Sequence, residues 1–360
     1  MSYTIPIGPY HPSLEEPIHA RLTVDGEKIT NAKVFIGYNH RGIEKLAQER
    51  NFIQTDVLVE RVCGICSHSH AMTYAMCVEK IAGMEVPKRG QYIRVIISEL
   101  ERIHSHLLWL GIACHIIGHD SLFMHSWNDR ERTMDLLEAI SGNRVNYAMN
   151  TIGGARRDID DAKRKMIIET LDDLEVKMQP LTHFLTTDKT VAMRTQGVGV
   201  LTREDGIRIG AVGPHARASG MDMDVRRDAP YTSYEDFEFN VPVVESGDVF
   251  ARVLIRVLET YESMKIIRQA VDMLPEGPIN LGNKIPKVPA GEFICCHEAP
   301  RGQLVYKVIT AGGPTNHRLS IHVPTFKNAP TVETMLKGNT VADAGLIVAS
   351  IDPCFSCMDC

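Results

Sequence analysis

The chain has 360 residues, of which 44% are hydrophobic and 23% are charged, a composition typical of globular proteins. Its formal net charge of −6 argues against nucleic acid as a main partner, because phosphate binding requires a basic face. No apolar run approaches the roughly 20 residues that a membrane-spanning helix needs, so any membrane attachment is expected through a partner.

The N-terminal part is expected to form a β-hairpin that is followed by helices. Residues 1–17 are rich in proline and are predicted to be irregular. Two strands, 18–24 and 28–36, are predicted around Asp25-Gly26, a pair that favours tight hairpin turns. After a loop at 38–44, apolar residues recur at helical spacing. The longer helices that this spacing predicts are 63–81, 89–117, 120–140 and 158–185.

The second half of the chain is expected to alternate between irregular and regular segments. Recurring glycines between 186 and 245 predict short strands and loops, with a hairpin around Glu204-Asp205-Gly206. A helix is predicted from Ser246 to Met273. The remaining predicted elements are strands at 292–297, 303–310 and 319–323 and a short helix at 331–336.

These elements predict an α+β fold, mainly a helical bundle with small β modules: the N-terminal hairpin and short central and C-terminal strands. We expect one domain over 1–360, because the two halves of the candidate metal site lie at opposite ends of the chain. Its expected parts are a loop and hairpin (1–40), the bundle (41–185), a β and loop module (186–245) and a helix, strands and metal-binding tail (246–360).

The cysteines give the strongest functional signal. Cys63 and Cys66 form one Cys-x-x-Cys motif, and Cys354 and Cys357 form another. Two intervening residues allow both sulfurs of a motif to face one ion. The chain contains nine cysteines and starts without a secretory signal pattern, which predicts a reducing compartment where paired cysteines more often bind metal than form disulfides.

Four thiolates form a soft ligand set, which suits zinc, an iron–sulfur cluster, or nickel and iron, and does not suit magnesium or calcium. Structural zinc is the ordinary alternative for two such motifs. Zinc ribbons, however, join their cysteine pairs through roughly 15–20 residues. Here nearly the whole chain separates the pairs, which favours a redox or catalytic metal.

With both motifs in place, the sequence resembles the large, catalytic subunit of nickel–iron hydrogenases. Within that family it is most similar to the membrane-bound energy-converting (Ech-type) group and to the related quinone-site subunit of respiratory complex I. The complex I relatives lack the metal-binding cysteines, whereas this chain has all four. The matching blocks are Gly8 to Pro12, Gly37 to Lys45, Glu60 to Cys66, Ser141 to Arg144, Ile152 to Gly154, Glu298 to Gly302 and Asp352 to Cys354.

The resemblance implies a hydrogenase large-subunit fold and the reversible reaction of two protons and two electrons to dihydrogen. It implies a Ni-Fe(CO)(CN)2 centre on Cys63, Cys66, Cys354 and Cys357. Cys66 and Cys357 would bridge nickel and iron, and Cys63 and Cys354 would be terminal ligands of nickel. Thiolates suit this chemistry because they are polarisable and stabilise a nickel that changes oxidation state.

Further site residues follow from the resemblance alone. The implied catalytic residues are Cys354, Glu16 as proton carrier and Arg301 beside the iron's cyanides. Without the family, Glu16 would be interpreted as a solvated loop acid, because most glutamates are exposed. The other implied cofactor-binding residues are Pro324, Thr325 and His70. Without the family, Thr325 would be interpreted as a threonine at a strand edge and His70 as an ordinary histidine on a helix face.

A second metal, magnesium or iron, is implied at Glu44. The family closes that second site with a terminal histidine or arginine, where this chain has Cys360. Cys360 is therefore interpreted either as a ligand or as a plain C-terminal thiol. Cys77 and Cys114 are predicted to belong to the hydrophobic core.

The resemblance also implies partners. Iron–sulfur clusters are expected only in other subunits: a hydrogenase small subunit with a 4Fe-4S cluster, and ferredoxin-like and other soluble subunits. Integral-membrane, ion-translocating subunits would hold the chain peripherally at the cytoplasmic side of the cell membrane, with ferredoxin as electron partner. The alternatives are a related complex with another acceptor (formate hydrogenlyase-type, sulfur or quinone) and a non-catalytic structural zinc or scaffold subunit.

Overall fold

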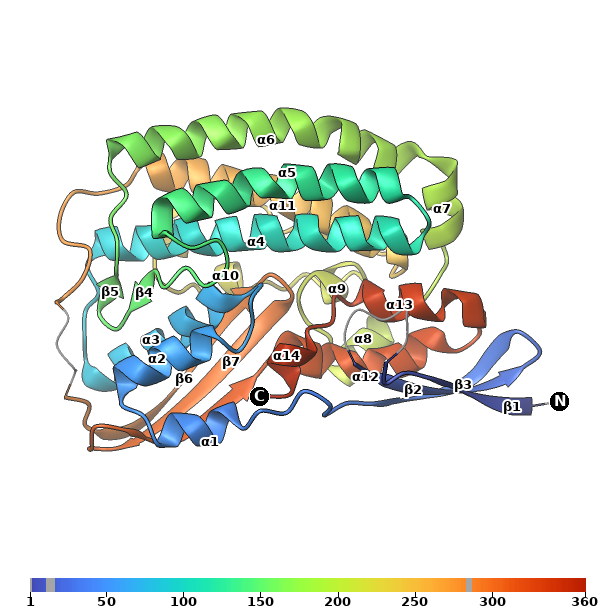
Figure 1. The fold of residues 1–360 in the computed structure, drawn as a ribbon, viewed down its shortest axis with the longest axis horizontal. Coiled ribbons are helices and arrows are strands. Elements are labelled where there is room, and N and C mark those ends of the chain that lie inside the picture. Colours follow the sequence, from blue (N-terminus) through green and yellow to red (C-terminus); the bar gives the residue numbers. More distant parts are fainter. Residues whose placement is uncertain (1, 11–16, 283–286) are drawn as a thin grey trace.

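The computed structural model describes residues 2–10, 17–282 and 287–360. The expected proton carrier Glu16 lies outside the described residues. Helices dominate the described part, and small antiparallel sheets complete an α+β fold, as predicted (Figure 1). The long helices form one layer, and the strands with the shorter helices form the other.

The N-terminal sheet has the order β1 (Ser2–Ile7), β2 (His19–Asp25), β3 (Lys28–Phe35). The predicted β2–β3 hairpin is confirmed, with Asp25 paired to Lys28 across the turn. The prediction of an irregular segment over 1–17 is wrong for β1. The side chains of β1 are largely exposed and give no alternating pattern, and its Pro6 is tolerated because β1 is an edge strand.

Three helices lie before and after the first cysteine pair in the chain: α1 (Ile43–Gln48), α2 (Phe52–Glu60) and α3 (Ser67–Ala82). Asn51 and Gln54 form a reciprocal capping box at the start of α2. Cys66 is the N-cap residue of α3, so the pair opens this helix as predicted. The helix ends at Gly83, whose left-handed conformation glycine adopts readily.

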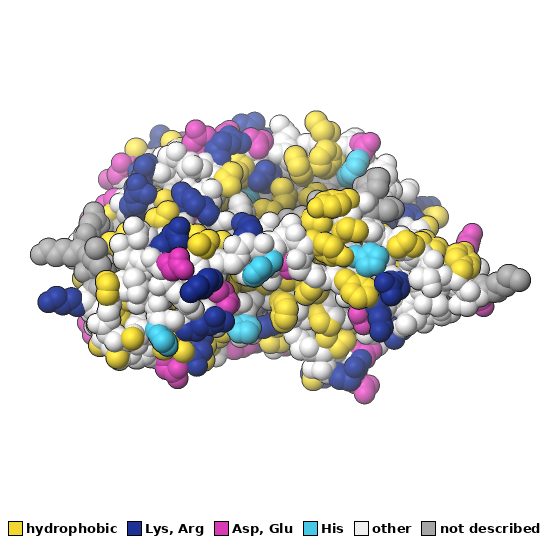
Figure 2. Space-filling view, turned by 60° about the horizontal axis from the view of Figure 1, so that its bottom comes forward, with side chains coloured by type: hydrophobic (Ala, Val, Ile, Leu, Met, Phe, Trp, Pro, Cys, Tyr) yellow, Lys and Arg dark blue, Asp and Glu magenta, His cyan; other side chains and the backbone are white. Residues whose placement is uncertain are grey.

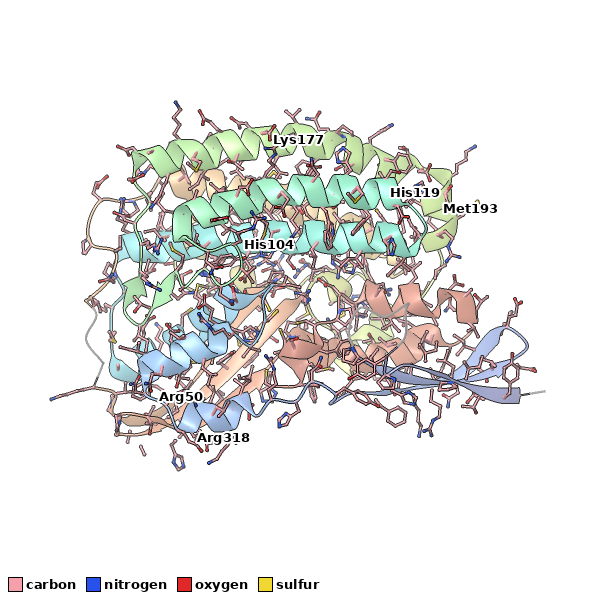
Figure 3. The ribbon with its side chains drawn as sticks, viewed as in Figure 1. Arg50, His104, His119, Lys177, Met193 and Arg318 are labelled. Carbon is pink, nitrogen blue, oxygen red and sulfur yellow. The ribbon has the colours of Figure 1, made fainter. Side chains whose placement is uncertain are left out.

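Four long helices build the helical layer: α4 (Lys88–Ile116), α5 (Asp120–Ser141), α6 (Asp161–Thr187) and α11 (Val249–Asp272). Each was predicted to within a few residues, because each presents apolar residues at helical spacing to a common core. Figure 3 shows His104 on α4 and Lys177 on the outer helix α6. A short hairpin, β4 (Asn150–Thr151) and β5 (Gly154–Ala155), connects α5 to α6.

Residues 186–245, all of which the structure describes, contain no strand, so the predicted β and loop module is wrong in its secondary structure. The expected hairpin around Asp205-Gly206 is helical. Thr202 caps that helix by accepting a hydrogen bond from the Asp205 amide, a capping signal that the Asp-Gly turn signal obscured. The short helices are α7 (Lys189–Thr195), α8 (Arg203–Ile209), α9 (Gly213–Arg217), α10 (Val225–Asp228) and η1 (Tyr234–Asp236).

The three predicted C-terminal strands are confirmed, and they form one sheet in the order β6 (Ala290–Ala299), β7 (Gly302–Ala311), β8 (Asn316–His322). Ala299 pairs with Gly302, so Pro300 and Arg301 form the turn between β6 and β7. The last predicted helix is longer than expected, because it starts at Pro324. The elements after β8 are α12 (Pro324–Leu336), η2 (Val341–Asp343), α13 (Ala344–Ser350) and α14 (Phe355–Met358).

The surface beside the N-terminal sheet is partly apolar. Figure 2 shows hydrophobic side chains gathered in one half of a face on which basic side chains are concentrated in the other half. The exposed large hydrophobic residues of β1, β3, α12 and the segment after β3 are Tyr3, Phe35, Ile36, Tyr38 and Phe326. Among the described residues, no helix combines the length and hydropathy that crossing a membrane requires.

Candidate metal centre

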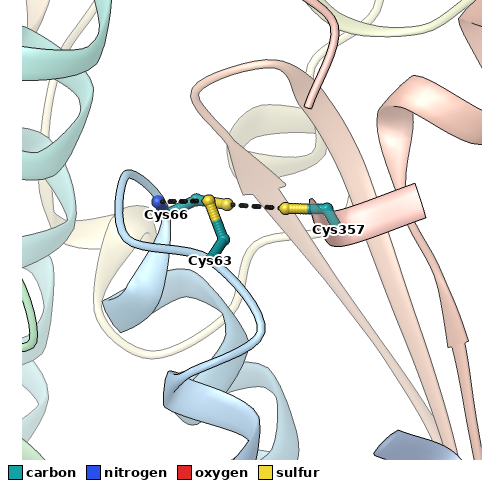
Figure 4. A group of neighbouring side chains, drawn as sticks. All are labelled: Cys63, Cys66 and Cys357. Carbon is teal, nitrogen blue, oxygen red and sulfur yellow. Dashed lines mark hydrogen bonds between the residues drawn. The ribbon is translucent and has the colours of Figure 1, made fainter. Parts of the chain in front are cut away.

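The fold brings the two cysteine pairs together from opposite ends of the chain. The sulfur of Cys63 lies 3.4 Å from that of Cys354, and the sulfur of Cys66 lies 3.3 Å from that of Cys357. The sulfurs of Cys354 and Cys357 are 3.1 Å apart. Each residue is at most 4% exposed. Figure 4 shows Cys357 on α14 facing the loop of Cys63 and Cys66. With Cys354 next to Cys63 and Cys357, four buried thiols lie together.

Arg41 ties the two cysteine segments to each other. Its Nη2 donates to the carbonyl of Val62 and to the carbonyl of Ser356, both at 2.7 Å. The backbone amide of Asn39 also donates to the carboxylate of Asp359 at 2.8 Å. The loop before α1 therefore holds the C-terminal segment against the first cysteine motif, a long-range contact that the sequence does not reveal.

The protons of the four thiols are shared unequally. Hydrogen bonds from Cys354, Cys357 and Cys66 lower the pKa of Cys63 well below its usual value. Burial, followed by hydrogen bonds with Cys354, Cys63 and Cys66, holds the pKa of Cys357 well above the usual value. A metal ion requires deprotonated thiolates, so its positive charge would replace the protons that now link these sulfurs.

Arg301 lies beside the thiols, in the β6–β7 turn, and is 5% exposed. It donates from Nε to the carbonyl of Asp352 at 2.9 Å, and its Nη2 lies 2.9 Å from the carboxylate of the same residue. Burial works against its charge, but attraction to Asp352 and then to Cys354 and Cys63 raises the pKa of Arg301.

The Nη1 atom of Arg301 is buried and has no hydrogen-bond partner. Leaving a buried donor unpaired costs about 1–3 kcal/mol, more when the donor is charged. A guanidinium with one free donor, next to four thiols, fits a centre that carries anionic ligands such as cyanide. The four thiols and this free donor therefore fit the expected centre.

Thr325 is placed next to Cys354 by the start of α12. Pro324 is the first residue of that helix, where its missing N–H costs nothing. The backbone amide of Cys354 donates to the hydroxyl oxygen of Thr325 at 3.1 Å. Because that oxygen acts as acceptor here, its own O–H remains available to donate to a ligand in the site.

His70 contacts the thiol cluster from α3. Its Nε2 lies 3.4 Å from the sulfur of Cys357, and its Nδ1 lies 2.6 Å from the hydroxyl of Tyr306. Burial lowers the pKa of His70 to about 4, so the ring is neutral near pH 7. Tyr306 keeps its proton, because burial raises its pKa, and donates it to Nδ1. In the tautomer that accepts this hydrogen bond at Nδ1, the ring proton is on Nε2 and can be donated to the sulfur of Cys357.

Glu44 does not lie in the thiol cluster. Its carboxylate accepts from Arg318 at 2.9 Å and from the backbone amide of Ile321 in β8 at 2.8 Å. Figure 3 shows Arg318 at the edge of the molecule next to α1. The thiol of Cys360 donates to the carbonyl of Cys357 at 2.6 Å, and burial raises the pKa of Cys360 to about 12.

Three site residues were missed by sequence reasoning: Asp352, Tyr306 and Arg41. Asp352 stands in the block before Cys354, and its positive φ of 55° marks a constrained backbone, but the sequence does not show that it pairs with Arg301. Tyr306 is one of the alternating buried residues of β7, a pattern that indicates core packing alone. Arg41 and Asp352 lie in blocks that match the family, which is the signal that could have found them, whereas no such signal marks Tyr306.

Buried thiols from both ends of the chain, with the charged Arg301 close enough to be attracted to them, define a candidate metal-binding subunit. A model described as "Nickel-dependent hydrogenase" matches residues 41–150. A model described as "Respiratory-chain NADH dehydrogenase, 49 Kd subunit" matches residues 117–287 and 281–360. The chain belongs to this family of hydrogenase large subunits and complex I 49 kDa subunits.

Known relatives cover essentially the whole chain. A carbon monoxide-induced hydrogenase of Rhodospirillum rubrum is 44% identical over 99% of both chains. A membrane-bound hydrogenase subunit alpha of Pyrococcus furiosus is 43% identical over 99% of this chain and 87% of its own length. A chain from the structure of an archaeal membrane-bound sulfane sulfur reductase aligns with a TM-score of 0.94 and 32% identity over 100% of this chain and 98% of its own.

Proposed function

We propose that this chain is the catalytic large subunit of a nickel–iron hydrogenase that interconverts two protons and two electrons with dihydrogen. The observation that carries the proposal is the unpaired Nη1 of Arg301 beside four buried, convergent thiols. When bound, a Ni-Fe(CO)(CN)2 centre would supply the redox chemistry. Cys63, Cys66, Cys354 and Cys357 would hold it through their sulfurs.

The other residues of the site have supporting roles in this proposal. Arg301 would donate to a cyanide from Nη1. Thr325, which follows Pro324 in the cofactor-binding segment, would donate its hydroxyl proton to a ligand of the centre. His70 would donate from Nε2 to Cys357 and so stabilise the sulfur as a thiolate. Cys354 would hold a proton on its sulfur and pass it on during turnover.

Glu16 is proposed as the next proton carrier, on the sequence resemblance alone. Replacing Glu16 with glutamine removes the titratable group and preserves its size. We expect the rate of hydrogen evolution to fall by about 100- to 10,000-fold, which is the usual contribution of a general acid or base. The nickel content should stay unchanged. Unchanged turnover in this variant would place the proton route elsewhere.

A second metal, magnesium or iron, is proposed near Glu44. Cys360 lies close enough for the Glu44 charge to contribute to its raised pKa. A metal at this point would have to replace the hydrogen bond from Arg318. Metal analysis of a Glu44→Gln variant would test this site: loss of one magnesium or iron per chain supports it, and an unchanged content rejects it.

Partner subunits complete the proposed function. The exposed Tyr3, Phe35, Ile36 and Tyr38 support a docking surface for other subunits. We propose a small subunit with a 4Fe-4S cluster, exchange of electrons with ferredoxin, and ion-translocating membrane subunits at the cytoplasmic side. The 360 residues would act as one domain, because the cysteine pairs of both ends share one site.

A related complex with another electron acceptor is the second candidate. The similarity to the sulfane sulfur reductase supports it, because that chain aligns over the whole of this one. The experiment that separates the candidates is metal analysis and activity of the intact complex purified without oxygen. About one nickel per chain with hydrogen turnover supports the hydrogenase. The hydrogenase is rejected if nickel is absent, or if the complex contains nickel but turns over only sulfur, formate or quinone. Zinc in place of nickel would indicate a structural site.

A further inference from the structure

The turn that carries Arg301 is attached to the helical layer by a second arginine, Arg102. Arg102 lies on α4 and is fully buried. Its Nη2 donates to the carbonyl of Glu298 at 2.5 Å, and its Nη1 donates to the carbonyl of Ala299 at 3.2 Å. Figure 1 shows the β6–β7 hairpin running across the molecule toward α4. One guanidinium thus hydrogen-bonds to the backbone carbonyls of the two residues that precede the Pro300-Arg301 turn.

Arg102 donates to two successive carbonyls near the end of β6. β6 is the edge strand of its sheet, so its outward-facing carbonyls have no strand partner. The planar, forked guanidinium of Arg102 can reach two carbonyls and a carboxylate at once. The carboxylate is that of Glu99, 3.1 Å from Nε of Arg102, which holds the guanidinium in its plane.

The carboxylate of Glu298 is held independently. Arg217 donates to its Oε1 at 2.9 Å, and the backbone amide of Val225 donates to its Oε2 at 3.3 Å. Arg217 in turn donates to Glu259 on α11 at 2.8 Å. The base of the turn is therefore fixed from α4 through its backbone and from α9 and α10 through the Glu298 side chain.

The backbone of the turn also packs closely against Gly213. A Cβ atom at this position would lie 2.5 Å from the carbonyl oxygen of Arg301 and 2.3 Å from the Cα of Gly302. Distances below 3.0 Å exclude a side chain there. This end of the hairpin thus contacts both the Arg102 guanidinium and the backbone of α9.

We propose that Arg102 is a positioning residue for Arg301: it fixes the β6–β7 turn from α4, so that the Arg301 guanidinium is held against the four cysteines. This inference rests on the proposed hydrogenase function. A displacement of about 1 Å at a reacting centre can cost roughly 100-fold in rate. Arg102 itself makes no described hydrogen bond to a cysteine, so its effect passes through the turn.

The test uses Arg102→Lys in the intact complex. Lysine keeps the charge but cannot bind two carbonyls and Glu99 in one plane. We expect kcat for hydrogen turnover to fall about 10- to 100-fold with nickel content unchanged. The infrared bands of the carbon monoxide and cyanide ligands should shift in the same direction as in Arg301→Lys. Arg102→Gln is the second variant, and its neutral amide should give the same shift.

Arg89→Lys is the matched control. Arg89 lies on the same helix, about 20 Å along its axis from Arg102. It is 6% exposed and donates to the carbonyls of Pro275 and Ile159 at 2.8 and 2.9 Å. It should lower stability without moving the infrared bands. Parental kcat and bands in either Arg102 variant, or equal band shifts in Arg89→Lys, would overturn the proposal.

Failure of the proposed function would be recognised separately. A parent complex without nickel or hydrogen turnover would reject the hydrogenase, whatever Arg102 does. The position of the Arg301 guanidinium relative to Asp352, measured by electron cryomicroscopy of the Arg102→Lys complex, then still decides the positioning role. An Arg301 that keeps its Asp352 contacts and its place beside the cysteines contradicts it.

Discussion

Replacing Cys63 or Cys354 with serine is expected to abolish hydrogen turnover. Serine has nearly the same size, but its hydroxyl is a hard ligand that stays protonated near neutral pH, whereas nickel is stabilised by soft thiolates. Both sulfurs lie in one hydrogen-bonded cluster, 3.4 Å apart, so each substitution removes a ligand from the same point. Hydrogen evolution should fall to background, and nickel content per chain should fall with it.

The matched control is Cys114→Ala. Cys114 is 1% exposed and lies near the end of α4, where its neighbours are apolar. Loss of its sulfur should lower stability by about 1 kcal/mol, as for other small deletions in a packed core, and leave nickel and turnover unchanged. A Cys63→Ser or Cys354→Ser complex with parental nickel and activity would disprove the proposed ligand set.

Replacing Arg301 with lysine is expected to reduce turnover about 100- to 1,000-fold, the loss typical when a preorganised charged donor is removed from an active site. Lysine keeps the positive charge, but it cannot hold Asp352 with two nitrogens and offer a third to a ligand. The rate of hydrogen evolution at saturating reductant is the measurement, with nickel content determined in the same preparation.

Arg252→Lys provides the comparison for Arg301→Lys. Arg252 is also fully buried and donates to Ser350 and to the carbonyls of Gly199 and Gly247, and it makes no described hydrogen bond to a cysteine. We expect this variant to lose thermal stability while its active fraction keeps the parental kcat. If Arg301→Lys behaves in the same way, Arg301 has a structural role only.

Local patterns predicted much of the architecture before the fold was known. The long helices α4, α5, α6 and α11 and the strands β6 to β8 were expected, because periodic apolar residues report which face is buried. Segments without such periodicity were predicted poorly. The region 186–245 folds as short helices whose ends are determined by caps such as Thr202 and by packing against α11 and α12.

The resemblance in sequence named the ligand set, and the structure brings all four of those cysteines together. It also placed Arg301, Thr325 and His70 beside them. Glu44 differs, because its carboxylate pairs with Arg318 and with β8. The sequence does not show whether a carboxylate is free to bind a metal or is already paired with a cation, because the pairing residue can lie anywhere in the chain.

The sequence by itself determined which chemical groups this protein brings to its site: two Cys-x-x-Cys motifs whose spacing allows each pair to face one ion. Only the tertiary structure decided how those groups are held. Arg41 joins the two motifs, Asp352 orients Arg301, and Arg102 fixes the turn beneath it. The physical reason is range: spacing within a motif depends on a few neighbouring residues, whereas each of these contacts forms only after distant segments have packed into one buried core.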